Sequence, residues 1–253
     1  MMSGFAQIRQ IEAVGFRAWP AATVHYDGSW AIRLTAGHPS KRLNSVNPLD
    51  PGDTRDMELR VERAVQRFRA FGRAPVFRNS PLAPPQLDAY LEACGWHRFD
   101  ETIVMTADME TLDLADALDQ IPMKDIGRFV DAVMSVKDFN PSLRIGLTEI
   151  LESIRPAKAF FVTREPDDEP VSTAICVHDG ALAGLFEVAT MFDYRRAGHA
   201  RNIVLSAMKW AQQHGAKTAW LQVEASNQPA VSLYRQLGFG EVYRYAYREG
   251  PRD

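Results

Sequence analysis

The segment YRRAGHA, at residues 194–200, lies between a predicted strand that ends near Thr190 and a predicted helix that begins near His199. Gly198 can adopt backbone angles that turn successive N–H groups toward one point, and a helix start adds unpaired N–H groups and a positive dipole end. Local positive charge comes from Arg195, Arg196, His199 and Arg201. The segment therefore predicts a pyrophosphate site, with solvated basic surface as the alternative.

A second segment, LQVEASNQPAVSLYRQLGF at residues 221–239, resembles the LxVxxxNxxAxxLYxxxGF motif of the GNAT superfamily of N-acetyltransferases. The first segment resembles the acyl-CoA pyrophosphate loop of that superfamily, [Q/R]xxGx[G/A], at Arg195, Gly198 and Ala200. Two motifs in this order and spacing make the resemblance specific. It covers residues 122–253, with particular similarity to ribosomal-protein alanine acetyltransferases and their relatives.

Apolar periodicity and turn residues predict a coarse order of elements in the second half of the chain. Helices are expected at residues 124–136, 147–154, 198–214 and 229–237, and strands at 157–163, 171–177, 182–190, 218–224 and 241–247. The resemblance implies the GNAT fold, an α/β (mixed α+β) arrangement in which helices flank a central mixed sheet.

The resemblance also implies acetyl-CoA as cosubstrate and direct attack of an amine on its thioester, in a cleft where the strands at 182–190 and 218–224 splay. The implied cofactor-binding residues are Ala189, Thr190, Arg195, Arg196, Ala197, Gly198, His199, Ala200, Arg201, Asn227 and Tyr234. A backbone N–H near Ala189 or Thr190 would bind the oxyanion. Asn227 would cap its helix, and Tyr234 would be the general acid, unless it is only a core aromatic.

The general base is less well defined, because Gln222 occupies the position at which several relatives place a glutamate, and an amide cannot accept a proton at neutral pH. Two carboxylates could replace it. Glu187 is favoured because it interrupts an apolar strand, and Glu224 lies on the same strand face as Gln222. A water chain, or no dedicated base, is the further alternative, and either carboxylate could instead form a salt bridge with an arginine.

An internal repeat relates the two halves of the chain. Glycines recur at a separation of 143 residues, as Gly37 with Gly180, Gly72 with Gly215 and Gly95 with Gly238. Apolar residues at helical spacing precede both Gly72 and Gly215, which suits a glycine that ends each helix in a left-handed conformation. We therefore expect a duplication, with two tandem GNAT-like halves at residues 1–112 and 113–253.

The first half lacks the coenzyme motifs on this alignment. The counterpart of the pyrophosphate loop is GDTRDM, at residues 52–57, where Asp53 and Asp56 stand in place of positive charge. Leu91 replaces Tyr234, and Pro84 replaces Asn227. The first half is predicted to be a degenerate domain without a CoA site. Some of its residues could line an acceptor pocket, although sheet packing is favoured: Trp30, Arg33, Arg42 and Asn44.

Composition narrows the class of protein further. The chain has 253 residues, 46% of them hydrophobic and 24% charged, and a net charge of −3, which argues against a nucleic-acid partner. No segment reaches the roughly 20 apolar residues that span a bilayer, so a cytoplasmic protein is expected. The histidines and cysteines show no metal-ligand spacing, so no metal site is expected.

The acceptor is not identified by these motifs. The expected partner is a small-molecule or peptide amine, and the sequence leaves a homodimer open. Two other functions compete with an acetyltransferase: a catalytically silent acyl-CoA-binding sensor or structural protein, and a pure interaction module.

Overall fold

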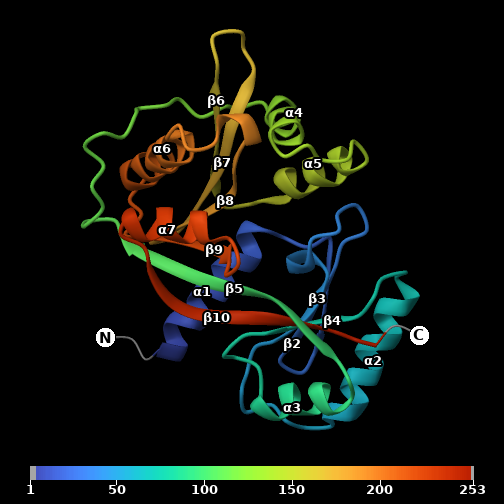
Figure 1. The fold of residues 1–253 in the computed structure, drawn as a ribbon. Helices are drawn as coiled ribbons and strands as arrows, with labels where there is room; N and C mark the ends of the chain where they lie inside the picture. The colour runs from blue at the N-terminus through green and yellow to red at the C-terminus, as the bar shows by residue number, and fades with distance from the viewer. Residues whose placement is uncertain (1–3, 252–253) are drawn as a thin grey trace. The chain divides into compact units, whose positions relative to one another are not determined.

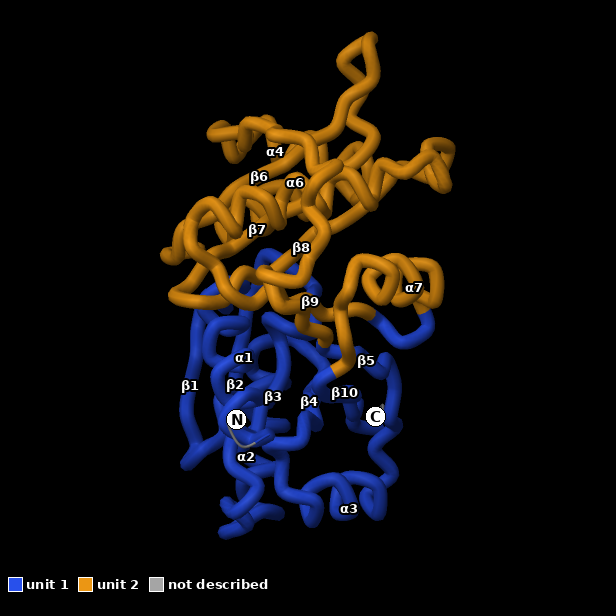
Figure 2. Tube along the Cα trace, turned by 90° about the vertical axis from the view of Figure 1, so that its left-hand side faces the viewer, with its two compact units in different colours: residues 1–104, 224–226, 242–253 blue, residues 105–223, 227–241 orange. Residues whose placement is uncertain are grey.

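The computed structural model describes residues 4–251 and divides into two compact units (Figure 2). Unit 1 comprises residues 1–104, 224–226 and 242–253, and unit 2 comprises residues 105–223 and 227–241. The predicted boundary after residue 112 places the C-terminal residues in the second half. The division into compact units instead assigns residues 242–253 to unit 1. That a degenerate GNAT-like domain makes up the first half remains a prediction.

Unit 2 has a mixed sheet flanked by helices (Figure 1). Its strands follow the order β9-β8-β7-β6, formed by Thr218–Glu224, Leu182–Thr190, Pro170–Asp179 and Ala157–Arg164. Its helices are α4 (Ile126–Val136), α5 (Leu143–Ser153), α6 (His199–Gln213) and α7 (Gln228–Gln236). Each predicted strand and helix of residues 122–239 is therefore present, which confirms the predicted order of elements.

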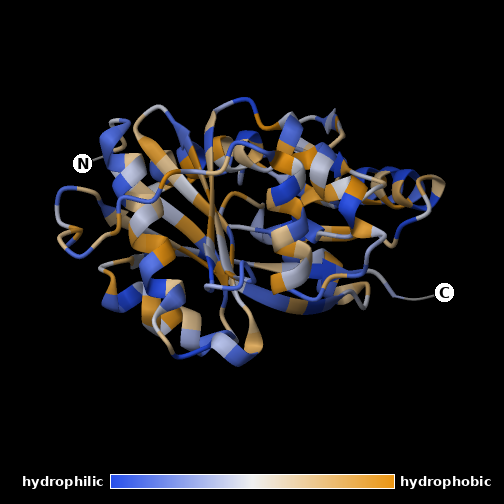
Figure 3. Cartoon of the chain, turned by 90° about the horizontal axis from the view of Figure 1, so that it is seen from above, coloured by the Kyte–Doolittle hydropathy of each residue, from blue (hydrophilic) through white to orange (hydrophobic). Residues whose placement is uncertain are grey.

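Helices cover the sheet of unit 2 on both faces. In β7, residues 171–177 are all buried, which a strand with one solvated face would not allow. Helix α6 packs on β6, β7 and β8 through its apolar stripe, and α4 packs on the same strands. Figure 3 shows polar and apolar residues sharing the helices, as expected for helices with one buried face.

The parallel strands β8 and β9 separate part of the way along their length. They are paired from Leu182↔Thr218 to Leu185↔Leu221, but β8 continues to Thr190 and β9 to Glu224. Strand β8 contains a β-bulge just after the last paired residue, Leu185. The bulge appears as a shift in the register with β7, from Ile175↔Phe186 to Thr173↔Ala189. The bulge bends β8 away from its parallel neighbour, so the predicted splay of these strands is confirmed.

Gly184 of β8 packs closely against Trp220 of β9 in the part where the two strands are paired. A Cβ added to Gly184 would lie 2.6 Å from the ring of Trp220, its register partner on β9. Gly184→Ala is therefore expected to lower the free energy of unfolding by about 1–3 kcal/mol, the usual cost of overpacking. Chemical denaturation measures this. Gly240→Ala is the matched control, because no atom lies within 4 Å of its added Cβ, and equal stability losses in both variants would contradict the prediction.

Unit 1 repeats the scheme of antiparallel strands followed by a parallel pair. Its strand order includes β1-β2-β3-β4-β10, formed by Thr23–Asp27, Trp30–Leu34, Ser45–Pro48, Val76–Asn79 and, from the C-terminal end of the chain, residues 242–249 of Gly240–Glu249. Strands β3 and β4 are parallel and are joined by α2 (Met57–Ala70). The remaining elements are α1 (Gly4–Ala18), the short 3-10 helix Lys41–Leu43, α3 (Pro85–Ala93) and β5 (His97–Asp108), whose last four residues belong to unit 2.

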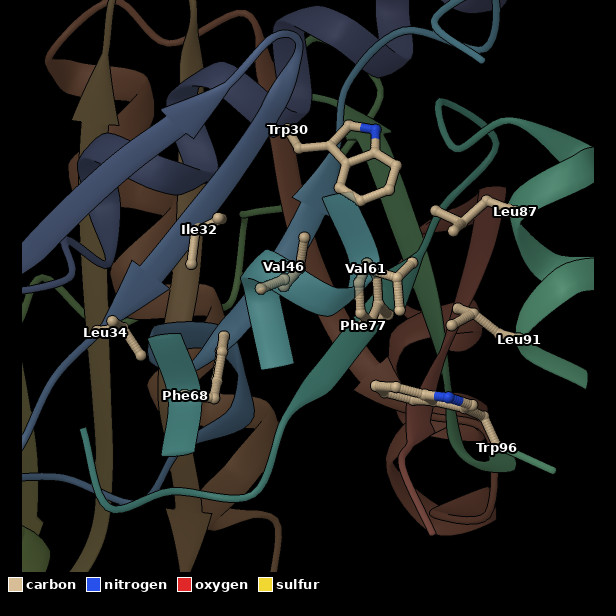
Figure 4. Packing of buried hydrophobic residues seen from close by; sticks show 11 residues of the cluster. Trp30, Ile32, Leu34, Val46, Val61, Phe68, Phe77, Leu87, Leu91 and Trp96 are labelled. Atoms are coloured by element: carbon tan, nitrogen blue, oxygen red, sulfur yellow. The ribbon is translucent and has the colours of Figure 1, made fainter. Parts of the chain in front are cut away.

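Aromatic rings form the centre of the unit 1 core (Figure 4). The Phe77 ring meets Trp30 and Trp96 edge to face, with ring centroids 5.6 and 5.2 Å apart. Leu87 and Leu91 of α3 complete the cluster and are fully buried. Leu91, the counterpart of Tyr234 on the predicted repeat, is thus a core residue of unit 1.

The structure supports the predicted repeat at the helix ends. Gly72, Gly95, Gly215 and Gly238 follow α2, α3, α6 and α7, and all four have positive φ, between 73° and 89°. The left-handed conformation predicted at Gly72 and Gly215 is therefore confirmed. Strand β5 begins at His97 and β10 at Gly240, again 143 residues apart.

Most of the first-half residues considered for an acceptor pocket are packing residues. Trp30 is fully buried, and the buried Arg33 donates hydrogen bonds to the carbonyls of Arg42 and Trp19. The Asn44 side chain is likewise used within its own loop, where it accepts from Thr35 N at 2.8 Å. Arg42 is half-buried. The structure thus agrees with the packing interpretation.

Candidate active site

A cleft of about 1160 Å³ opens on unit 2 beside the part of β8 that has left β9. Three segments line it: the end of α4, the stretch from β8 to the first turn of α6, and α7 with its N-cap residue. Its residues are Ser135, Val136, Lys137, Asp138, Val188, Ala189, Thr190, Met191, Phe192, Tyr194, Arg195, Arg196, Gly198, His199, Ala200, Arg201, Asn227, Pro229, Ala230, Leu233 and Tyr234. All predicted cofactor-binding residues except Ala197 are among them.

The loop before α6 presents a row of free backbone donors. Gly198 is the N-cap residue with φ 88°, and Arg196 also has a positive φ, of 63°. Within residues 4–251, no acceptor is found for the backbone N–H groups of residues 196–201. Helix starts leave such donors unpaired, and their partial positive charge favours a negatively charged ligand. The geometry thus suits a phosphate group at the mouth of the cleft.

Side chains around this loop combine exposed cations with nearby carboxylates. Arg195 is exposed and lies over the Phe192 ring, 5.1 Å from its centroid. His199 Nε2 lies 4.0 Å from Glu165 Oε1. Tyr194 donates a hydrogen bond of 2.9 Å to Glu169, and this bond raises the pKa of the tyrosine. The carboxylates belong to the β6–β7 turn, so cationic loop and acidic turn face each other.

Helix α7 and its N-cap residue form another part of the cleft lining. Asn227 is its N-cap residue and accepts a hydrogen bond of 3.2 Å from Ala230 N, so the predicted cap is present. Tyr234 is 7% exposed, and burial raises its pKa to about 12. Its ring packs edge to face on Phe239, with centroids 5.9 Å apart. Tyr234 is therefore both a packed aromatic and a protonated hydroxyl at the cleft.

Glu187 occupies the bulge of β8 with a left-handed backbone, φ 48°. Its carbonyl accepts a hydrogen bond of 3.0 Å from Thr173 Oγ1, which holds the bulge. Its side chain is 9% exposed, and Oε2 lies 2.7 Å from the ammonium of Lys137. Glu187 is not among the described residues that line the cleft, so its carboxylate meets the cleft through Lys137.

Glu224, the other carboxylate considered as a base, is exposed at the end of β9 and is grouped with unit 1. It does not appear among the described residues that line the cleft. Gln222 is half-buried in β9. The structure therefore places Tyr234, Asn227 and the loop before α6 around one cleft. Glu187 is not part of the described lining and contacts the lining residue Lys137.

Lys137 and Asp138 were not predicted from the sequence. Lys137 is the C-cap residue of α4, and Asp138 follows it with φ 48°. The only sequence signal for them is the end of the apolar periodicity at residue 136, which marks a helix end but not what lies opposite. No cluster of His, Cys, Asp or Glu suited to a metal ion occurs within the described part of the chain, and none of its helices is long and apolar enough to cross a membrane.

Comparison with known proteins identifies the family of this chain. Residues 5–248 match the sequence model of a family described as "Probable histone acetyltransferase Rv0428c C-terminal". The chain belongs to this family. The Rv0428c C-terminal family match includes both units, and the chain is an N-acetyltransferase with the GNAT fold.

Relatives of this member of the Rv0428c family agree with that assignment. It is 27% identical to the uncharacterised N-acetyltransferase YobR of Bacillus subtilis over 246 residues, 95% of this chain and 98% of YobR. It is 36% identical to an N-alpha-acetyltransferase of Sulfurisphaera tokodaii over 115 residues, 40% of this chain and 69% of that protein. The [ribosomal protein bS18]-alanine N-acetyltransferase of Escherichia coli matches over 60 residues at 41% identity, 24% of this chain and 40% of that protein.

Solved structures show the same fold over the whole chain. A GCN5-related N-acetyltransferase from Kribbella flavida superposes with a TM-score of 0.71 and 17% identity, over 100% of this chain and 98% of that one. A tandem GNAT protein from the clavulanic acid biosynthesis pathway has a TM-score of 0.63 and 16% identity, over 96% and 89% of the two chains.

Proposed function

We propose that this protein transfers the acetyl group of acetyl-CoA to a primary amine by direct attack of the amine on the thioester. The observation that carries the proposal is a row of six backbone N–H groups, at residues 196–201, for which residues 4–251 provide no acceptor. All but one of these six residues line the same cleft as Tyr234. These donors would bind the coenzyme pyrophosphate, since charge-assisted hydrogen bonds to backbone N–H groups are strong. Exposed Arg195, Arg196 and Arg201 add positive charge.

The reaction needs three further groups, which the chain supplies in the proposed mechanism. Glu187 accepts the proton of the incoming amine once Lys137 has moved aside. A backbone N–H of Ala189 or Thr190 binds the oxyanion, where preorganised donors have their largest effect. Tyr234 donates a hydrogen bond, and then its proton, to the departing thiolate.

The acceptor is proposed to be a primary amine of a small molecule or of a protein. The matched family is described as probable histone acetyltransferases, and two relatives carry names that specify a ribosomal-protein alanine and an N-alpha position. Two of these descriptions name a protein as the acceptor, and the third names an N-alpha position. We further propose that unit 1 binds no coenzyme, because Asp53, at the counterpart of the loop, already bonds Ser29 and Arg60.

A matched pair of glycine variants tests the loop. Gly198 (φ 88°) and Gly215 (φ 89°) flank α6, and a Cβ on either would meet no atom within 4 Å. Alanine in a left-handed conformation costs about 1–2 kcal/mol at either site. Gly198→Ala is expected to weaken acetyl-CoA binding about tenfold or more by calorimetry, whereas Gly215→Ala loses similar stability without losing affinity. Equal affinity in both variants would remove the loop from the site.

A measurement of turnover distinguishes an enzyme from a catalytically silent acyl-CoA-binding protein. The silent alternative is considered because the proposed base, Glu187, already forms an ion pair with Lys137. Acetyl-CoA stabilises the fold in either case, because a ligand that binds only the native state raises its stability. Release of free CoA thiol with a panel of amines and protein N-terminal peptides occurs only for the enzyme. Stabilisation without thiol release would favour the sensor.

A further inference from the structure

The ammonium of Lys137 contacts the carboxylate that the proposed function assigns as the general base. It is 2.7 Å from Glu187 Oε2, the carboxylate to which an acceptor would give its proton. It also lines the cleft, together with Ala189, Thr190 and Tyr234. Lys137 is one of six lysines in the chain and the only one among the described lining residues of the cleft.

The backbone proposed to bind the thioester oxyanion, at Ala189 or Thr190, lies close to this amine along β8. Glu187 precedes Ala189 by two residues along β8, and two residues of extended strand span roughly 7 Å at most. The bulge at Glu187 makes the actual separation shorter. A lysine carries its ammonium on a flexible four-carbon stem, so rotation about its side-chain bonds can move the nitrogen over that distance. Lys137 is also 28% exposed, which leaves its side chain room to turn into the cleft.

From this arrangement we propose that Lys137 is a self-acetylation site, an inference that rests on the proposed function. Glu187 takes a proton from the ammonium, and Nζ attacks the carbonyl carbon of the acetyl-CoA thioester. The new C–N bond replaces the C–S bond, and Tyr234 protonates the leaving thiolate. The second proton lost by Nζ restores the Tyr234 hydroxyl, and the proton held by Glu187 passes to solvent. The products are Nε-acetyl-Lys137 and CoA, and no other reactant is needed.

Acetylation would change the site that performs it. An amide nitrogen carries no charge, so Glu187 would lose the cation that now lies against it. Acetylation would therefore also abolish the ion pair that now occupies the proposed base.

Isotope labelling tests the proposal on the full-length protein. The protein is incubated with acetyl-CoA that carries a ¹³C-labelled acetyl group, and lysine-containing peptides are quantified by mass spectrometry after cleavage with a protease that does not require lysine. Lys217 is the internal control: it also faces a carboxylate, Glu110 at 3.5 Å, but is 67% exposed and away from the described lining of the cleft. Non-enzymatic acetylation would label Lys217 at least as fast.

The expected result is labelling of Lys137 at least tenfold faster than Lys217, with a rate constant independent of protein concentration. Tyr234→Phe and Glu187→Gln should both slow Lys137 labelling at least tenfold while Lys217 labelling is unchanged, and thermal melting shows that each variant is folded. Equal labelling of the two lysines, or a rate that rises with protein concentration, would overturn the proposal. If thiol release occurs with external amines while Lys137 stays unlabelled, the self-acetylation fails and the proposed function stands. If acetyl-CoA neither stabilises the protein nor releases thiol, both fail.

Discussion

Tyr234→Phe is expected to lower the turnover number about 100-fold and to leave acetyl-CoA affinity within about twofold. Loss of a general acid commonly costs 10²- to 10⁴-fold in rate. The lower end is expected here because a thiol has a pKa of about 8.5, so the thiolate can also leave unassisted. Phenylalanine keeps the edge-to-face contact with Phe239, so the packing of α7 should survive. Steady-state kinetics and calorimetry measure the two effects.

The pKa of Tyr234 adds a second measurement. Burial raises that pKa to about 12, so the hydroxyl keeps its proton throughout the pH range in which the enzyme can be assayed. A general acid loses activity as pH rises through its pKa, and no such loss from Tyr234 is expected below about pH 10. Tyr26→Phe, on a side chain that is 71% exposed in β1, serves as control. Unchanged turnover in Tyr234→Phe would remove this hydroxyl from the mechanism.

The elements that form the cleft could be predicted because their signals are local. Strands β8 and β9 have the predicted bounds, residues 182–190 and 218–224, since apolar β-formers end at clear turn residues. Gly198 and Asn227 mark helix starts through the backbone chemistry of single residues. Helix α5 begins four residues earlier than predicted, at Leu143, because exposed Arg144 and Ile145 conceal the apolar periodicity of its first turn.

Contacts between distant segments could not be predicted in the same way. The sequence places a strand near residues 241–247, but its pairing with β4 depends on partners more than 160 residues away, such as Ala246↔Asn79. The Lys137–Glu187 ion pair likewise joins residues 50 positions apart. No sequence periodicity indicates that the end of one helix lies beside the bulge of a distant strand. The sequence therefore identified Glu187 as unusual but did not indicate that Lys137 faces it.

A buried ion pair in unit 1 is expected to have the largest effect on stability. Arg78 of β4 donates two hydrogen bonds to Glu12 of α1, at 2.6 and 2.8 Å, and both side chains are 4% exposed. Tyr243 of β10 donates a third bond to the same carboxylate. Burial alone would raise the pKa of Glu12, but the charge of Arg78 and the bonds from Arg78 and Tyr243 lower it below its ordinary value.

Glu12→Leu is expected to lower the free energy of unfolding by about 3–5 kcal/mol, because it leaves the Arg78 guanidinium buried without a counter-charge. For a chain of this size that corresponds to a fall in melting temperature of roughly 6–20 °C. The double variant Glu12→Leu/Arg78→Met should be more stable than Glu12→Leu, since it also removes the stranded charge. A double variant as unstable as the sum of both single variants would show that the two side chains act independently.

The pH dependence of the same variants separates the ion pair from simple packing. A carboxylate whose pKa is lowered by folding contributes stability above its unfolded pKa, about 4.3, and that contribution is lost as pH falls through the lower folded value. The stability gap between the wild type and Glu12→Leu should therefore be full at pH 7 and should narrow below about pH 4. Because Tyr243 lies on β10, this carboxylate also holds the C-terminal strand in unit 1, and hydrogen exchange of residues 242–249 should speed up in Glu12→Leu. A gap that is constant from pH 7 to about pH 3 would mean that the lost stability comes from packing and not from the charge.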